Sequence, residues 1–256
     1  MQGVYVSGNS QGPALVLLHS SMSSARQWRE LVDQLDDTFR VINFDLLGYG
    51  QAPAPSLPFG LENETQRIEQ HLSDLGVRQF HLCAHSFGGA VALKLAHERP
   101  NAVLSLSVFE PVAFHLLSRQ SAGWYEIQEL GLQVDSLDAA QAGACFVNYW
   151  NGVGYFESMP MPVQQGFAAQ VKKVRMDFSG LTEEAYQLAD YAQIQCPVLL
   201  LGGKESRTSA LEVLDGLAAS LPNVQRKWVS GGHMSPISHS KEVNDLLLSF
   251  LAVQTA

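Results

Sequence analysis

Ser86 has the neighbours that a nucleophilic serine needs. The segment LCAHSFGGAVALKLA (82–96) places it after a short apolar run and just before two glycines. In G-x-S-x-G turns between a strand and a helix, the serine adopts a strained conformation that exposes its hydroxyl above the sheet. The small residues Ala84 and Gly88 would let the helix approach the strand. The segment predicts a nucleophile, although a serine that only caps a helix would also fit.

A serine hydroxyl becomes a good nucleophile when a histidine accepts its proton. Among the eight histidines, His233 lies in a glycine-rich segment, SGGHMSP, after the last expected strand. A flexible backbone there would let the imidazole reach Ser86. His239, just before the last expected helix, is the weaker alternative, and His233 would otherwise be a structural loop residue.

Acyl transfer also needs donors for the negative oxygen of the tetrahedral intermediate. The backbone amide of Phe87, directly after the nucleophile, is the first expected donor. The second is the amide of Ser21, in the segment LHSSMSS (18–24) that follows the first buried apolar run. The same serines would also fit a turn that caps a helix.

The elements that must position these residues follow an alternating pattern. Short apolar runs predict buried strands at 14–20 and 40–50, and the continuing pattern predicts further strands at 79–85, 102–111, 196–203 and 224–232. Helical spacing of apolar residues separates them, which predicts a mostly parallel sheet with helices on both faces. Residues 112–192 interrupt the pattern and contain no expected strand. We therefore expect an α/β core formed by 1–111 and 193–256, and a helical cap at 112–192.

Composition excludes several classes of function. The 256 residues are 46% hydrophobic and 16% charged, with a net charge of −9 and no long basic run, which argues against binding nucleic acid or an anionic membrane. The three cysteines lie far apart, so neither a disulfide framework nor a metal cluster is expected. No signal peptide or transmembrane span is predicted. We expect a cytoplasmic protein without metal or cofactor, whose partner is a small-molecule substrate; the sequence does not indicate its oligomeric state.

The motifs LHSS, NFDLLGYG, AHSFGG, CPVLLLGG and GGHMSP occur in that order. Together they resemble the α/β-hydrolase superfamily, in particular its bacterial cap-bearing members of esterase and lipase type. The resemblance implies an eight-stranded, mostly parallel sheet, a lid built from the insertion, and chemistry without a cofactor. The usual HG of the oxyanion loop is His19-Ser20 here, so the assignment of Ser21 depends on its position.

In the superfamily, the serine and histidine form a catalytic triad with an acidic residue that orients the histidine. The position of this acid in the present sequence departs from the common pattern. Most members carry an aspartate three residues after the glycine that ends the PVLLL-x-G strand, and here that position holds Ser206. Some members, haloalkane dehalogenases among them, carry the acid after the strand that follows the nucleophile helix. Glu110 stands there, and a charge at the end of an apolar strand is costly unless it has a partner such as His233. Glu205 is the second choice, and Glu110 would alternatively be an exposed strand-end residue.

These residues predict hydrolysis of a carboxylic ester, with Ser86 forming an acyl-enzyme. Carbon–carbon bond hydrolysis, acyl transfer to another acceptor, and a non-catalytic ligand-binding protein remain alternatives on the same scaffold. The cap segment CFVNYWNGVGYF (145–156) is rich in aromatic residues, which either pack or line a partly apolar pocket. Possible pocket residues are His19, Phe114, Tyr149 and Trp150. The sequence does not predict the acyl chain length or the leaving group.

Overall fold

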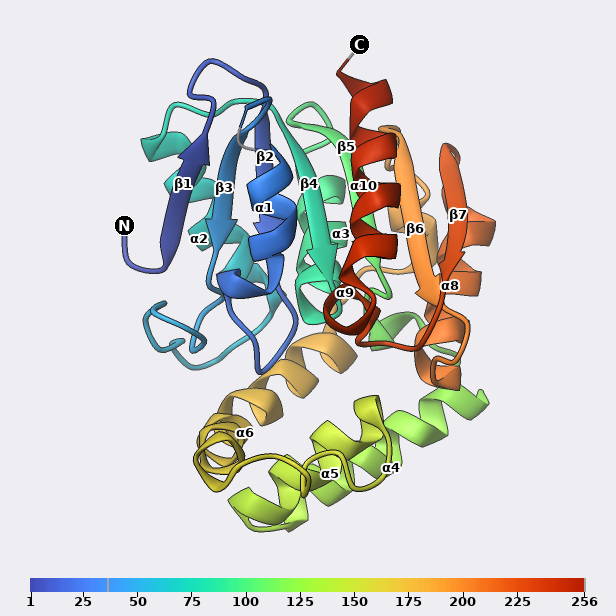
Figure 1. Cartoon of the computed structure of the whole chain (residues 1–256). Coiled ribbons are helices and arrows are strands. Elements are labelled where there is room, and N and C mark those ends of the chain that lie inside the picture. Colours follow the sequence, from blue (N-terminus) through green and yellow to red (C-terminus); the bar gives the residue numbers. More distant parts are fainter. Residues whose placement is uncertain (36, 256) are drawn as a thin grey trace.

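The computed structural model describes residues 1–35 and 37–255, and its centre is a sheet of seven strands (Figure 1). The strands run in the spatial order β1-β3-β2-β4-β5-β6-β7. Their bounds are β1 Val4–Gly8, β2 Ala14–Leu18, β3 Arg40–Phe44, β4 Phe80–His85, β5 Val103–Phe109, β6 Val198–Gly203 and β7 Val224–Val229. β1 pairs with β3 in the antiparallel sense, and the other neighbouring pairs are parallel.

The sheet differs from expectation at its N-terminal edge. Six strands lie within the segments that were predicted to form them, whereas β1 was not predicted because most of its residues are exposed and no alternating pattern precedes it. An edge strand is held by one neighbour and need not be apolar. The expected count of eight strands is wrong for the described residues, which form a sheet of seven.

Helices cover both faces of the sheet (Figure 1). The helices of the core are η1 Ala25–Trp28, α1 Arg29–Leu35, α2 Leu61–Asp74, α3 Phe87–Glu98, α8 Thr208–Ser220, α9 Ser235–Ser238 and α10 Ser240–Gln254. Apolar residues of α1 and α10 pack on one face, and those of α2, α3 and α8 pack on the other. The predicted α/β architecture with helices on both faces is confirmed.

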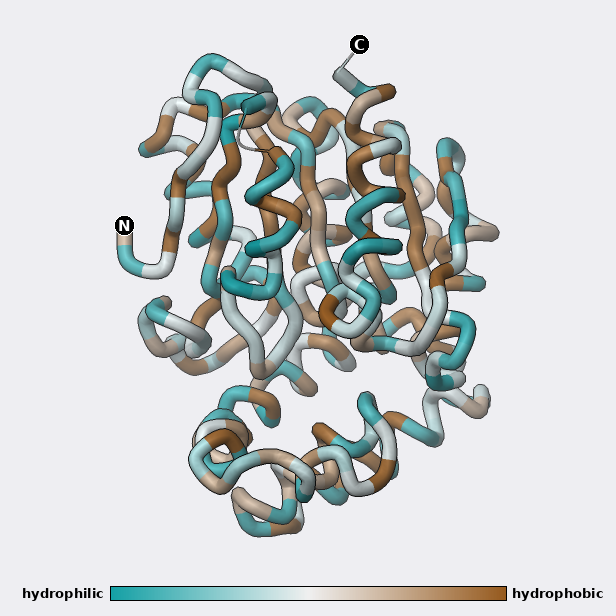
Figure 2. Tube along the Cα trace, viewed as in Figure 1, coloured by the Kyte–Doolittle hydropathy of each residue, from teal (hydrophilic) through white to brown (hydrophobic). Residues whose placement is uncertain are grey.

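Neighbouring residues of the central strands contribute to two different cores. On β2, Leu15 and Leu17 pack with α1 and α10, whereas Val16 and Leu18 pack with α2 and α3. Because all four are fully buried, the strand reads as a continuous apolar run, and Figure 2 shows such runs along the centre of the sheet.

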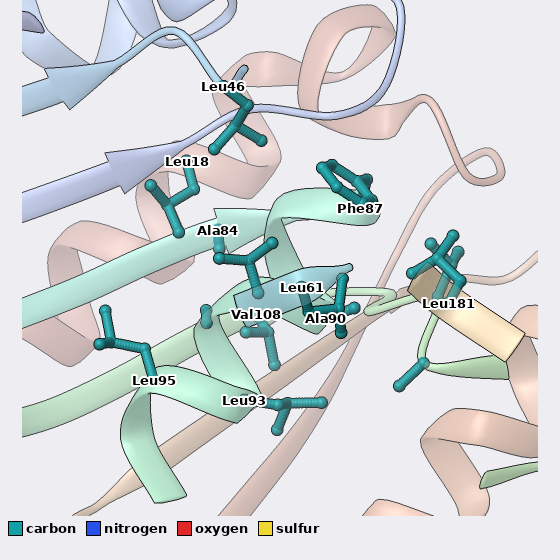
Figure 3. Packing of buried hydrophobic residues seen from close by; sticks show 14 of the residues in the cluster. Leu18, Leu46, Leu61, Ala84, Phe87, Ala90, Leu93, Leu95, Val108 and Leu181 are labelled. Atoms are coloured by element: carbon teal, nitrogen blue, oxygen red, sulfur yellow. The ribbon is translucent and has the colours of Figure 1, made fainter. Parts of the chain in front are cut away.

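The core that contains Val16 and Leu18 extends from the sheet into α3, the helix that follows Ser86. Figure 3 shows Leu18, Ala84 and Val108 from three adjacent strands beside Ala90 and Leu93 of α3. This packing fixes α3, and with it the residue at its N-terminus, against the ends of β4 and β5.

Residues 112–192 form no strand and lie at the carboxyl ends of the parallel strands (Figure 1). Their helices are η2 Phe114–Leu116, α4 Ala122–Ser136, α5 Ala139–Asn151, α6 Met161–Glu183 and α7 Leu188–Tyr191. α5 packs against both α4 and α6. The helical insertion therefore covers the carboxyl ends of the strands, where Ser86 follows β4 and Glu110 follows β5. That the insertion is a separate domain remains a prediction.

Within residues 1–35 and 37–255, no helix combines the length and apolar character that a bilayer-crossing segment requires.

Candidate active site

Ser86 occupies a strained turn between β4 and α3. Its backbone has φ +57° and ψ −119°, a left-handed region that a residue other than glycine rarely adopts. The Ser86 amide donates to the Phe109 carbonyl at 3.0 Å, which fixes the turn to the end of β5. A Cβ at Gly88 would lie 2.5 Å from the His19 carbonyl oxygen, so this position needs glycine. The turn has the geometry that the sequence predicted.

The structure joins Ser86, His233 and Glu110 in one chain of hydrogen bonds. His233 Nε2 lies 2.8 Å from Ser86 Oγ, and His233 Nδ1 lies 2.7 Å from Glu110 Oε2. A carboxylate only accepts hydrogen bonds, so Nδ1 carries the proton and Nε2 accepts from the hydroxyl. All three side chains are buried. The arrangement can transfer a proton from the serine to the imidazole while the carboxylate orients the ring.

The Glu110 carboxylate has two further donors. Its Oε1 accepts from the Gly203 amide at 2.7 Å and from Ser206 Oγ at 2.5 Å. These bonds offset the cost of burying the charge and fix its direction toward the imidazole. Ser206 stands at the position where the resemblance to the superfamily would place the acid, and here its hydroxyl donates to the acid that directly follows β5. The sequence does not predict this bond.

The two alternative residues do not meet the serine or the imidazole. Glu205 is exposed, and its side chain forms no hydrogen bond or ion pair with any described residue. His239 is also exposed, and its Nδ1 bonds to Ser238 Oγ at 2.9 Å. Neither residue therefore takes part in the hydrogen-bonded chain.

The amides of Phe87 and Ser21 are available to a ligand. Neither donates to a protein acceptor within residues 1–35 and 37–255. Met22, directly after Ser21, has φ +55°, a backbone conformation that is unfavourable for a residue other than glycine. The segment 18–24, called the oxyanion loop below, therefore bends sharply at this residue. The Ser21 hydroxyl donates to Asp177 Oδ2 at 2.7 Å.

His85 holds the histidine loop in place. Its Nε2 donates to the His233 carbonyl at 2.9 Å, and the two rings are 4.9 Å apart. Burial, with a contribution from the neighbouring His233, lowers the pKa of His85 well below its usual range. His85 is therefore a neutral donor that fixes the backbone of His233, a role that its place next to Ser86 in the sequence does not indicate.

A cavity of about 260 Å³ has Ser86 and His233 in its wall. The Trp150 ring stacks on the His233 ring, with centroids 3.8 Å apart and planes inclined by 30°. Further apolar side chains around the cavity are Phe146, Met159, Phe167, Met234 and Ile237. Among the described residues, no lysine, arginine, aspartate or glutamate lines it. The cavity thus suits a small, largely apolar, uncharged group.

Of the four suggested pocket residues, Trp150 lines this cavity and the other three do not. His19 is buried, its Nε2 accepts from the Leu46 amide at 2.9 Å, and burial lowers its pKa to about 4, so it is a neutral structural group. Phe114 is buried in the core. The Tyr149 hydroxyl donates to Glu126 at 3.0 Å. Hydrogen bonding and packing toward other parts of the fold keep these three side chains out of the cavity wall.

Within the described residues, no cluster of three or more histidine, cysteine, aspartate or glutamate side chains has the geometry to hold a metal ion.

A family model described as "Alpha/beta hydrolase family" matches residues 15–246. The putative carbamate hydrolase RutD of Stutzerimonas stutzeri is 29% identical over 250 residues, which cover 94% of this chain and 92% of that protein. The 2-hydroxymuconate semialdehyde hydrolase of Pseudomonas putida is 28% identical over 222 residues, covering 84% and 78%. A thermophilic esterase from Thermogutta terrifontis has a TM-score of 0.80 at 18% identity, covering 100% of this chain and 94% of that one, a likeness of fold alone.

Proposed function

Because the chain belongs to the α/β-hydrolase family, we propose that it hydrolyses a carboxylic ester of a small, partly apolar acid through an acyl-enzyme on Ser86. The observation that carries this proposal is the hydrogen-bonded chain Ser86–His233–Glu110 beside the cavity. Such a chain supplies a nucleophile, a base and an orienting carboxylate.

In the proposed reaction, Ser86 Oγ attacks the ester carbonyl carbon while His233 Nε2 takes its proton. The amides of Phe87 and Ser21 donate to the oxygen that becomes negative. His233 then returns the proton to the leaving alkoxide, and the acyl group stays on Ser86. Water, deprotonated by His233, attacks the acyl carbon, and the bond to Ser86 Oγ breaks to release the acid while His233 returns the proton to Ser86 Oγ. Glu110 stabilises the imidazolium in both steps.

The nucleophile disfavours the dehalogenase chemistry known elsewhere in the superfamily. If Ser86 displaced a halide from carbon, it would form an ether, which water does not readily cleave. A carboxylate nucleophile instead forms an ester that water can hydrolyse, and no acidic side chain lines the described cavity.

The absence of charged side chains from the described cavity wall favours a neutral ester over 2-hydroxymuconate semialdehyde, the substrate in the name of the Pseudomonas putida relative. A muconate carries a carboxylate, and a buried carboxylate needs a cationic or hydrogen-bonding partner. No lysine or arginine lines the described cavity. Carbon–carbon bond hydrolysis of an anionic substrate is therefore the less favoured reaction.

A panel of p-nitrophenyl esters, from acetate to octanoate, tests the proposal together with a p-nitrophenyl carbamate and a fluorophosphonate probe. The wild type should cleave one or more esters and take up the probe. Ser86→Ala should lose the label, with kcat reduced on the order of 10⁶-fold. The matched control is Ser249→Ala on α10, whose hydroxyl bonds to the Asp245 carbonyl at the surface. Wild-type esterase activity in Ser86→Ala, or a wild type that neither labels nor cleaves any ester, would refute the proposal.

A further inference from the structure

The cap helix α6 carries an ion pair in the protein interior. Lys173 and Asp177 lie one helical turn apart, and Lys173 Nζ contacts Asp177 Oδ1. Their side chains are only 6% and 1% exposed. A buried ion pair costs desolvation energy, which burial of apolar residues there would avoid. The proposed reaction gives neither residue a direct role, so their presence at this place calls for another explanation.

The second carboxylate oxygen of Asp177 reaches the oxyanion loop. Asp177 Oδ2 accepts from Ser21 Oγ at 2.7 Å and from the Tyr49 hydroxyl at 2.5 Å. Burial and the neighbouring Asp177 charge raise the pKa of Tyr49, which keeps its hydroxyl a donor. Asp177 thus ties the loop that follows β2 to a helix 156 residues away in the sequence.

The ammonium group of Lys173 lies next to Phe87, the other residue whose amide is a proposed oxyanion donor. Lys173 Nζ is 4.5 Å from the ring centroid of Phe87 and 4.3 Å from that of Phe59. It also lies 3.8 Å from Glu64 Oε1, a buried carboxyl that accepts from the Leu47 amide. One ion pair on α6 therefore contacts both residues whose amides are the proposed oxyanion donors, Ser21 through its hydroxyl and Phe87 through its ring.

We propose that Lys173 and Asp177 are positioning residues for the oxyanion hole, with Asp177 setting the Ser21 amide through the Ser21 hydroxyl. The inference rests on the proposed function, because it gives the Ser21 amide a role in catalysis. It also makes the cap part of the catalytic machinery. Because Asp177 belongs to α6, the position of the second donor depends on how the cap packs on the core.

The local backbone shows why such a tether is needed. An oxyanion donor must lie 2.7–3.1 Å from the position of the negative oxygen. Ser21 lies in an irregular loop, and the next residue, Met22, has a positive φ, which is unfavourable for a residue other than glycine. The bond from the Ser21 hydroxyl to Asp177 is a contact that restrains this loop from the cap side.

Three variants test the inference: Ser21→Ala, Ser21→Thr and Asp177→Asn, with the double variant Ser21→Ala/Asp177→Asn. For each we would measure kcat and KM on the best ester, with active sites counted by fluorophosphonate labelling, and the midpoint of thermal unfolding. Ser21→Ala keeps the amide and loses only the hydroxyl. We expect kcat per active site to fall about tenfold to a hundredfold, less than for full loss of an oxyanion donor. KM should change little, because the donor acts in the transition state.

The other variants separate positioning from stability. Ser21→Thr keeps a hydroxyl and should restore most of kcat. Asp177→Asn should lower kcat as Ser21→Ala does, and the double variant should be no worse than the poorer single variant, since both changes break one link. The matched control is Lys94→Met, which breaks a buried ion pair with Glu98 and Glu184 away from the oxyanion loop. It should lower the unfolding midpoint and leave kcat per active site unchanged.

Wild-type kcat per active site in Ser21→Ala would overturn the inference, whatever the stability of that variant. Fully additive losses in the double variant would also overturn it. Ser21→Ala removes one hydroxyl and keeps the buried ion pair, so this arm remains decisive even when Asp177→Asn does not fold. If either overturning result is found while the wild type is active and Ser86→Ala is not, the inference alone fails and the proposed function stands.

Discussion

Replacing Glu110 with glutamine tests how the imidazole is held. The glutamine oxygen can still accept from the Gly203 amide and Ser206, but its NH₂ group then faces His233 Nδ1, where the carboxylate now lies at 2.7 Å. Two donors cannot face each other, so the imidazole must move its proton to Nε2. In that tautomer the nitrogen beside Ser86 is no longer an acceptor. The change therefore disables the base without altering the volume of the site.

The expected loss is large. Loss of the orienting carboxylate in a serine triad lowers kcat about 10⁴-fold, which corresponds to roughly 5.5 kcal/mol of transition-state stabilisation. The assay is kcat and kcat/KM on the best ester of the panel, with circular dichroism and the thermal midpoint recorded for each variant. Glu205→Gln is the matched control, because this exposed side chain contacts neither Ser86 nor His233. Its activity should equal that of the wild type.

Two results would refute the reasoning. A Glu110→Gln variant that keeps kcat within tenfold of the wild type would show that another group orients the imidazole. Loss of turnover in Glu205→Gln, with Glu110→Gln active, would show that the acid comes from the loop after β6.

Ser206→Ala removes one of three donors to the buried Glu110 carboxylate and should lower kcat about tenfold, measured on the same ester; wild-type turnover would show that Ser206 does not orient the acid. Trp150→Ala removes the ring stacked on His233 and enlarges the cavity, so the ratio of kcat/KM for octanoate over butyrate esters should rise about tenfold, and an unchanged ratio would contradict this placement. Burial lowers the pKa of His115 from 6.5 to about 4. Between about pH 6.5 and pH 4 the unfolded chain therefore binds a proton that the folded protein does not bind, so the folded state loses stability as the pH falls through this range. His115→Gln should remove about 2 kcal/mol of the stability loss between about pH 7 and pH 5, measured by urea unfolding at both; an equal loss in the two proteins would show that this imidazole does not stay neutral.

Local features of the sequence determined most of the fold. A strand buried on both faces is largely apolar, so the five inner strands could be predicted from their composition. The two edge strands are mostly not buried: β7 was predicted from its place after the helix α8 in the alternating pattern, whereas β1 had no such pattern before it. The turn at Ser86 was also predictable, since its small neighbours and flanking elements lie within a few residues.

The residues around the site depended more on tertiary structure. His19 follows a buried strand, a position that predicted a place in the pocket, yet both of its nitrogens are engaged by backbone groups. The role of Ser206 depends on the pairing of β5 with β6, which brings Ser206 next to Glu110. Sequence spacing does not reveal which way a side chain points at a strand end.

By itself, the sequence determined the scaffold, the strained serine and the short choice of partners for it, because these follow from residue type and local spacing. Only the tertiary structure decided that Glu110 rather than Glu205 faces the imidazole, and that Asp177 of the cap meets Ser21. The physical reason is that hydrogen-bond geometry depends on strand register and helix packing, which bring together groups far apart in the chain.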